Sequence, residues 1–153
     1  MQLDAHRLGP TRFPDSVVPY RPFSRADGFR THWWVGYLSG NGENLEWWAY
    51  RDDGPDDVAR VEVKLNPRFE HSYQVSAPAN GFIEIVFIEV RQGQQRRGVG
   101  RDVVSQLRSA YPGRTLGALS EEDAFWSALG WSAHLRPNVP DLHKGRTLFI
   151  APA

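Results

Sequence analysis

A short basic segment with two glycines is the part of the sequence best suited to hold a ligand. It reads Gln95-Arg96-Arg97-Gly98-Val99-Gly100, and Arg101 follows it. Glycines let a ligand approach the backbone closely, and free amides at the start of a helix attract an anion with the positive end of the helix dipole. The segment is therefore predicted to hold a pyrophosphate on backbone amides, helped by Arg96, Arg97 or Arg101. The alternative is a basic turn whose glycines serve its geometry alone.

A carboxylate inside an apolar run is the second candidate for chemistry. Residues 82–90 are apolar apart from Glu84 and Glu89. Strand alternation puts Glu84 on one face with Phe82, Val86 and Ile88, and such surroundings raise the pKa of a carboxyl group. Glu89 falls on the opposite face and is expected to be structural. The alternative for Glu84 is a carboxylate at the strand end that pairs with an arginine or lies in solvent.

The elements around these residues form a strand, a loop and a helix. Residues 82–90 suit a central strand, and residues 99–110 carry apolar side chains at helical spacing until Pro112 and Gly113 end the helix. A strand is then predicted at 115–119, a helix at 121–129 with Ser120 as N-cap and Gly130 as terminator, and a last strand at 147–150.

The first half of the chain is predicted to be rich in strands and poor in helices. Closely spaced prolines favour an extended segment over residues 1–30, packed on the domain. Residues 33–39 and 45–51 flank an Asn-Gly pair and are predicted to form a β-hairpin. Residues 58–65 alternate as a half-exposed strand, and residues 66–81 form an irregular connection that is either a substrate loop or a short extra strand. We expect the tryptophans of this hairpin to pack mainly in the core; the alternative is that they line an acceptor pocket.

Composition limits the classes of protein that fit. The 153 residues suit a single domain spanning 1–153, and 18 basic residues balance 18 acidic ones, so no overall field attracts nucleic acid or a membrane surface. Without cysteine there is no disulfide, thiolate zinc site or cysteine nucleophile. The histidines lack ligand spacing, so no metal is predicted. The absence of an apolar span or signal-like start leads to an expected cytoplasmic location.

The basic segment resembles the Q/R-x-x-G-x-G/A signature of the GNAT acyltransferases, in the strand-before, helix-after context of that motif. It matches neither the Walker loop nor the dinucleotide fingerprint. A second stretch, residues 125–131, is similar to the family's F-Y-x-x-L-G-F helix end. The resemblance implies an α+β fold with a mixed, mostly antiparallel sheet, splayed at its centre and flanked by helices.

The resemblance also implies site residues. Glu84 stands where the histone acetyltransferase branch has its general base, and the strand end stands where the family binds the pantetheine arm of acetyl-CoA through its backbone. The cofactor-binding residues it implies are Ile88, Glu89, Val90, Gln95, Arg96, Arg97, Gly98, Val99, Gly100, Arg101, Ser120 and Trp126. Trp126 replaces a tyrosine that acts as general acid in many members, and indole cannot act so. Either Ser120 supplies the proton or the thiolate leaves unaided.

The sequence thus predicts an N-acetyltransferase that moves an acetyl group from acetyl-CoA to a primary amine in a ternary complex. The acceptor is left open between small molecules and protein amines, and the resemblance allows a homodimer. One alternative is an acyl-CoA-binding module without turnover. Another is a nucleic-acid-binding domain that uses Arg91, Arg96, Arg97 and Arg101 with tryptophans as stacking platforms, which the even charge balance disfavours.

Overall fold

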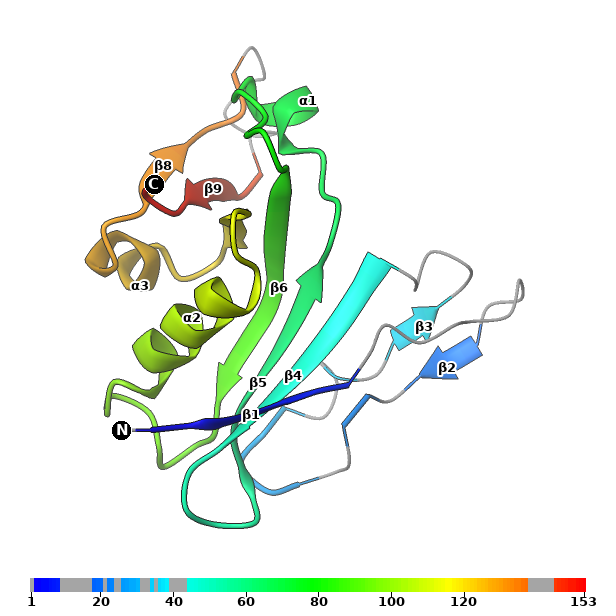
Figure 1. Cartoon of the computed structure of the whole chain (residues 1–153), viewed down its shortest axis with the longest axis vertical. Helices are drawn as coiled ribbons and strands as arrows, with labels where there is room; N and C mark the ends of the chain where they lie inside the picture. Colours follow the sequence, from blue (N-terminus) through cyan, green and yellow to red (C-terminus); the bar gives the residue numbers. More distant parts are fainter. Residues whose placement is uncertain are drawn as a thin grey trace.

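A seven-stranded sheet forms the main layer of the protein (Figure 1). The computed structural model describes residues 2–8, 18–20, 22–23, 26–30, 34, 36–38, 44–137 and 145–153. The strands of the sheet are, in spatial order, β1 (Asp4–Arg7), β4 (Leu45–Arg51), β5 (Asp57–Lys64), β6 (Phe82–Val90), β7 (Thr115–Ser120), β9 (Thr147–Ile150) and β8 (Ser132–His134). Every neighbouring pair is antiparallel except β6 and β7, which are parallel. The predicted α+β fold with a mixed, mostly antiparallel sheet is confirmed.

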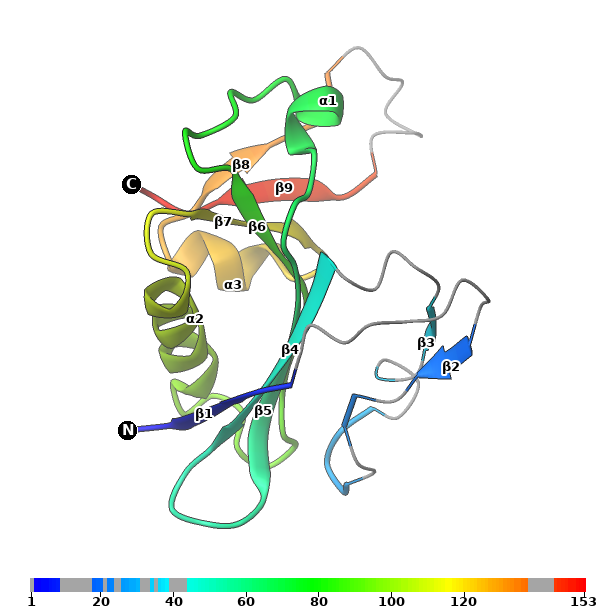
Figure 2. The same cartoon turned by 45° about the vertical axis from the view of Figure 1, so that its right-hand side comes forward.

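Other elements flank the sheet on both sides (Figures 1 and 2). Helices α2 (Val99–Ala110) and α3 (Asp123–Ala128) lie on one side, and a small sheet of β2 (Val18–Tyr20) and β3 (Gly36–Leu38) lies on the other. The main core fills the space under α2, where Val103 and Leu107 meet Val61, Ile83 and Phe149 of the sheet. No helix in the described part of the chain has the length and apolar character needed to cross a membrane.

The second half of the chain follows the sequence prediction closely. β6, α2 and β9 have the predicted bounds, and β7 is one residue longer than predicted. Helix α3 begins later, with Glu122 as its N-cap and no side-chain cap, so the prediction of Ser120 as N-cap is wrong. Ser120 still belongs to β7, and its Oγ accepts a hydrogen bond from the Glu122 amide at 2.9 Å. Gly130 ends the helix as predicted, with φ of 77°.

The predicted hairpin of residues 33–39 with 45–51 is wrong. Strand β4 lies between β1 and β5, so both of its edges are occupied, and β3 pairs with β2 in the separate sheet. The Asn-Gly turn itself lies outside the described residues. The prediction that the tryptophans pack mainly in the core is confirmed for those that the structure describes, because Trp34 and Trp47 are buried and Trp48 is partly buried. Trp33 lies outside the described residues.

β5 is not the half-exposed strand that its alternation predicted. Arg60, assigned to the exposed face, keeps only 3% of its surface exposed. Its guanidinium lies 4.9 Å from the ring of Phe23 and 4.2 Å from the ring of Phe29, and its Nε is 3.1 Å from an oxygen of Asp57. The N-terminal part of the chain therefore covers a face that the sequence pattern assigned to solvent.

The connection after β5 contains a short helix, α1 (Phe69–Tyr73), and no extra strand. Its Phe69 ring rests on Gly117 of β7, where a Cβ atom would come within 2.6 Å of the ring. Glycine at position 117 is what allows α1 to sit directly on the sheet, on the face opposite α2, since α2 packs on Leu116 and Ala118 while Phe69 packs with Phe82 and Leu148.

Candidate active site

The central strands β6 and β7 pair over only part of their length. Their parallel register runs from Phe82 with Thr115 to Glu84 with Gly117. From Ile85 to Val90, β6 pairs with β5 on one edge, and no strand of the described chain pairs with its other edge. The predicted splay at the centre of the sheet therefore begins directly after Glu84. Unpaired backbone groups along an open edge are free to bind a polar ligand.

A β-bulge at Val86 marks the same point. Val63 of β5 faces Ile85, and the preceding residue, Glu62, faces Phe87, so Val86 is an extra residue in β6. An extra residue reverses the alternation of side chains along the rest of the strand. Ile85 and Ile88 both pack toward the core under α2, whereas Phe87 packs with Trp34 and Trp47 on the other face.

The bulge corrects two predictions about side chains. Ile88 does not share a face with Glu84, and Glu89 does not lie opposite it, because the alternation shifts by one residue at Val86. The Glu89 carboxylate accepts a hydrogen bond from Trp34 Nε1 at 2.8 Å and another from the Arg30 amide at 3.0 Å. The structural role predicted for its side chain fits these contacts, which fasten the N-terminal part of the chain to β6.

The backbone N–H and C=O groups at the end of β6 point alternately toward β5 and toward the open edge. This distinguishes among the three residues assigned to the pantetheine arm. The Arg91 amide donates to the Val58 carbonyl at 2.8 Å, and in an antiparallel ladder every second residue points to the same partner. Glu89 therefore directs its backbone groups toward β5, and Ile88 and Val90 direct theirs toward the open edge. The Val90 carbonyl there accepts from Gln95 Nε2 at 3.3 Å. Ile88 and Val90 fit the assigned role, and Glu89 does not.

The glycine segment forms the turn that enters α2. Gly98 is the N-cap with φ of 80°, a left-handed conformation that favours glycine, and a Cβ atom added there would meet no atom within 4 Å. The Asp102 amide donates to the Gly98 carbonyl at 3.0 Å and closes the first turn of the helix. The amides of Val99, Gly100 and Arg101 precede that bond and lack intrahelical acceptors. They point out of the helix start beside the open edge of β6.

The side chains of this segment divide into two groups. Arg96, Arg97 and Arg101 are exposed, and Arg97 reaches Gln94 Oε1 at 3.3 Å. Val99 is 1% exposed and contributes only its backbone to the surface. Gly100 has a packing role that sequence reasoning did not assign, because an added Cβ atom would lie 3.0 Å from the ring of Phe125. The segment thus presents one open glycine, free amides and three arginines.

Ser120 and Trp126 are buried, and each keeps only 5% of its surface exposed. The Trp126 ring packs against Phe125 at 4.8 Å and Trp131 at 4.6 Å, within the main core. The Ser120 hydroxyl is engaged by Glu122. The surroundings of both side chains are those of core residues, in contrast to the cofactor contacts that the resemblance implied.

Two carboxylates, those of Glu84 and Glu62, lie on the sheet face opposite α2. Burial raises the pKa of Glu84, and the positive charges of Lys64 and Arg146 act against that shift. Burial also raises the pKa of Glu62 on β5, where the hydrogen bond from Trp47 Nε1 at 2.8 Å lowers it and the charge of Glu84 raises it. Sequence reasoning missed Glu62 because it assigned that residue to an exposed face. Its place opposite Phe87, at the bulge, puts it next to the start of the open edge.

Tyr73, at the end of α1, is a further residue that the sequence did not single out. Its hydroxyl donates to the Arg146 carbonyl at 2.6 Å, and burial raises its pKa, with Arg136 and Arg146 lowering it and Glu84 raising it. No group of three or more histidine, aspartate or glutamate side chains arranged to hold a metal occurs among the residues that the structure describes. The site so defined is an open strand edge with the glycine turn at one end and the partly buried carboxylate of Glu84 at the other.

Comparisons with known proteins place this arrangement in a fold class. No protein-family model matches the sequence, and no curated protein matches it. Among solved structures, an acetyltransferase from Thermus thermophilus is 18% identical with a TM-score of 0.51, and the match covers 72% of this chain and 65% of that one, slightly under two thirds. The structure of AtaT complexed with acetyl-methionyl-tRNAfMet is 12% identical with a TM-score of 0.52, covering 99% and 95% of the two chains. A GNAT-family acetyltransferase from Staphylococcus aureus gives 9% identity and a TM-score of 0.48, covering 71% and 67%.

The chain has the fold of the GNAT acetyltransferases. Likeness at these identities concerns the fold, so the chemistry must be argued from this chain's own residues.

Proposed function

We propose that the protein is an N-acetyltransferase that transfers an acetyl group from acetyl-CoA to a primary amine. The observation that carries the proposal is the open edge of β6, which begins at the Val86 bulge and runs between the free amides of the α2 start and the partly buried Glu84. A pyrophosphate would bind at Gly98 and the first-turn amides, and a polar arm would lie along the backbone groups of Ile88 and Val90.

Direct transfer follows from the placement of Glu84. An acceptor approaching the sheet face opposite α2 meets Glu84, which takes a proton from the ammonium, and the neutral amine then attacks the thioester carbon. Backbone amides on the open edge stabilise the oxyanion, the carbon–sulfur bond breaks, and the coenzyme leaves as a thiolate. Holding both reactants in one site supplies much of the rate.

The leaving thiolate does not need a protein acid in this scheme. Trp126 is buried and has no acidic proton to give, and Ser120 is buried, with its Oγ accepting a hydrogen bond from the Glu122 amide. A thiol has a pKa of about 8.5, so its conjugate base is a tolerable leaving group near neutral pH. Proton uptake from solvent then completes the reaction.

The binding half of the proposal is tested by calorimetric titration with acetyl-CoA of the native protein and of Gly98→Asp. A carboxylate at position 98 points into open space and repels the pyrophosphate. Gly130→Asp is the matched control, because Gly130 has φ of 77°, nearly the 80° of Gly98, and an added Cβ atom there also meets nothing within 4 Å. The backbone strain of the two variants is thus the same, and only Gly98 lies at the ligand turn.

Micromolar binding that survives Gly130→Asp and is lost in Gly98→Asp supports the proposed site. Equal binding by native protein and Gly98→Asp, or no binding by the native protein, refutes it. Transfer is then followed as thiol release with a panel of primary amines. The panel includes an aminoacyl-tRNA, because the match with AtaT extends over nearly the whole of both chains.

The second candidate function is an acyl-CoA-binding module without turnover, which the burial of Trp126 and Ser120 favours. It predicts the same acetyl-CoA binding, with the same loss in Gly98→Asp, and no thiol release with any amine. Base stacking on tryptophans is not supported, since Trp34 and Trp47 keep 4% and 1% of their surface exposed.

A further inference from the structure

Lys64 is the primary amine that the fold places beside the carboxylate proposed as the base. The chain has two lysines, Lys64 and Lys144, and only Lys64 belongs to the described residues. Lys64 is the partner of Glu84 in the antiparallel register of β5 and β6, and both side chains lie on the sheet face opposite α2. Side chains directly opposite each other in such a pair have Cβ atoms about 4.5–5.5 Å apart.

The surroundings of Lys64 leave its amine accessible. The side chain is exposed, and among the described residues it forms no salt bridge and no side-chain hydrogen bond. Burial raises the pKa of Glu84, and of the two positive charges that act against this shift Lys64 contributes more than Arg146. The ammonium of Lys64 therefore lies near the Glu84 carboxylate without being fixed in an ion pair.

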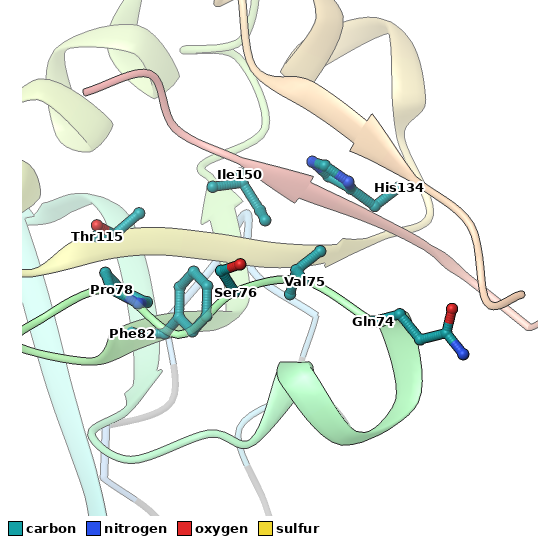
Figure 3. A pocket seen from close by; sticks show the side chains of 8 residues that line it. All are labelled: Gln74, Val75, Ser76, Pro78, Phe82, Thr115, His134 and Ile150. Carbon is teal, nitrogen blue, oxygen red and sulfur yellow. The ribbon is translucent and has the colours of Figure 1, made fainter.

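The other side of Glu84 is occupied. Its partner on β7 is Gly117, and the Phe69 ring rests on that glycine and packs with Phe82 in a buried cluster. A pocket of about 380 Å³ adjoins this cluster and has Phe82 in its lining (Figure 3), but neither Glu84 nor Lys64 lines it. The described neighbour that brings an amine to Glu84 is thus Lys64, on the β5 side.

The amine of Lys64 can reach the place proposed for the thioester. The open edge of β6 begins directly after Glu84. Neighbouring strands are about 4.8 Å apart, and the flexible four-carbon stem of a lysine is long enough to extend over the adjacent strand. From β5, Lys64 can therefore place its nitrogen over β6 at the open edge. An amine on the same chain as the bound thioester reacts in an intramolecular step, which greatly raises its effective concentration.

We propose that Lys64 is a self-acetylation site, whose amine takes the acetyl group from acetyl-CoA bound to the same chain. Glu84 removes one proton from the ammonium, and the neutral nitrogen attacks the thioester carbon. The nitrogen–carbon bond forms, the carbon–sulfur bond breaks, and the nitrogen releases a second proton to solvent. The departing thiolate takes up a proton, so the products are acetyl-lysine and free coenzyme A. The inference rests on the proposed function for the thioester and the base, and it adds an acceptor within the chain itself.

The test is incubation with acetyl-CoA and no added amine, followed by peptide mass spectrometry. Lys64 is expected to gain one acetyl group, at a rate per chain that does not depend on protein concentration. The matched control is Ala133→Lys, which adds a second lysine at an exposed position on β8, three strands away from β6. Lys64 is expected to react faster than the added lysine by about 10²–10⁴-fold, the value of general-base assistance. Equal rates at the two positions overturn the inference.

Two variants and a mixture test where the reaction takes place. Glu84→Gln is expected to slow acetylation of Lys64 by the same factor, and Gly98→Asp is expected to abolish it by blocking the pyrophosphate turn. Lys64→Arg keeps Glu84 but cannot be acetylated at this position. Added to Glu84→Gln, it is expected not to restore acetylation there, because base and lysine must belong to one chain. Undiminished acetylation in either variant, or its recovery in the mixture, overturns the inference. Thermal unfolding checks that each variant is folded, and acetyl-CoA titration checks that Glu84→Gln and Lys64→Arg still bind.

Thiol release by Lys64→Arg with the panel of added amines separates this inference from the proposed function. Release with an added amine, together with an unmodified Lys64 in the native protein, refutes self-acetylation alone. Acetylation of Lys64 that passes the tests above supports the inference even if no added amine reacts, a result that would count against an external acceptor only. A native protein that binds acetyl-CoA and shows neither reaction refutes both and leaves the binding module.

Discussion

Replacing Glu84 with glutamine tests the proposed chemistry most directly. Glutamine has nearly the same shape but cannot accept the proton of the acceptor ammonium. General-base assistance is worth about 10²–10⁴-fold in rate, which corresponds to about 3–5 kcal/mol of transition-state stabilisation. Glu84→Gln is therefore expected to lower kcat/KM for an amine found in the screen by that factor, with acetyl-CoA affinity unchanged because Glu84 lies away from the glycine turn.

The pH dependence of kcat/KM tests the role of Glu84 as base more sharply than the rate alone. A base acts only when deprotonated, so the native kcat/KM is expected to rise with pH through the pKa of Glu84, which burial raises above its usual value. This limb should disappear in Glu84→Gln. In Glu62→Gln it should persist and move to lower pH, because the substitution removes a neighbouring negative charge that couples to Glu84. If Glu84→Gln keeps the limb, or Glu62→Gln abolishes it, Glu84 is not the base.

Stability gives an independent check on the same residue. A carboxyl group whose pKa is raised on folding contributes stability that is present below its unfolded pKa and is lost as the pH rises through its folded pKa. Glu84 therefore destabilises the native protein at neutral pH, and Glu84→Gln, which cannot ionise, is expected to be more stable there. Urea unfolding at neutral pH and near pH 3.5 measures the difference, which should nearly vanish at the lower pH, where a carboxyl with a pKa above about 4.3 is largely protonated. A neutral-pH gain that persists undiminished in acid would argue against a raised pKa.

Two further substitutions test the packing that positions the site. Glu89→Ala leaves the Trp34 indole and the Arg30 amide without their acceptor, and a loss of about 2–5 kcal/mol in unfolding free energy is expected from urea denaturation; a change under about 0.5 kcal/mol would show that these contacts contribute little. Gly117→Ala forces a Cβ atom to within 2.6 Å of the Phe69 ring and is expected to cost about 1–3 kcal/mol. In a double-mutant cycle with Phe69→Ala that cost should largely disappear, and simple additivity of the two losses would contradict the contact.

The parts of the fold that the sequence predicts well are those in which one period holds throughout. α2 has apolar residues at helical spacing from Val99 to Leu107, and all of its buried residues lie on one face. β6 is an apolar run bounded by turns, and its length was predicted correctly. The N-terminal half offered no such guide, since all four residues of β1 are exposed and show no alternation. β1 is held by its pairing with β4, which is a tertiary contact.

The errors at the site have a common origin in contacts between distant segments. Arg60 and Glu62 alternate with valines as an exposed face would, yet Phe23 and Phe29 cover Arg60, and the Trp47 indole holds Glu62. The alternation of residues within β5 cannot show that this face of the strand is covered, because the covering residues lie about thirty positions earlier in the sequence. Glu62 could have been noticed only by asking which carboxylate a neighbouring strand brings beside Glu84, and that question needs the register between β5 and β6.

Val86 shows most clearly why the geometry of the site had to come from the structure. The run Phe82 to Val90 is compatible with a bulge at any of several positions, because apolar residues occupy both faces of the strand and no alternation marks the extra residue. Where the bulge falls decides which side chains face the acceptor. At Val86 it leaves Glu84 on the face of Phe82 and the pocket, brings Phe87 and Glu89 to that face to anchor the N-terminal layer, and turns Ile88 to the core. Because β6 parts from β7 at the same place, one added residue both opens the strand edge proposed for the cofactor and aims the carboxylate proposed as base.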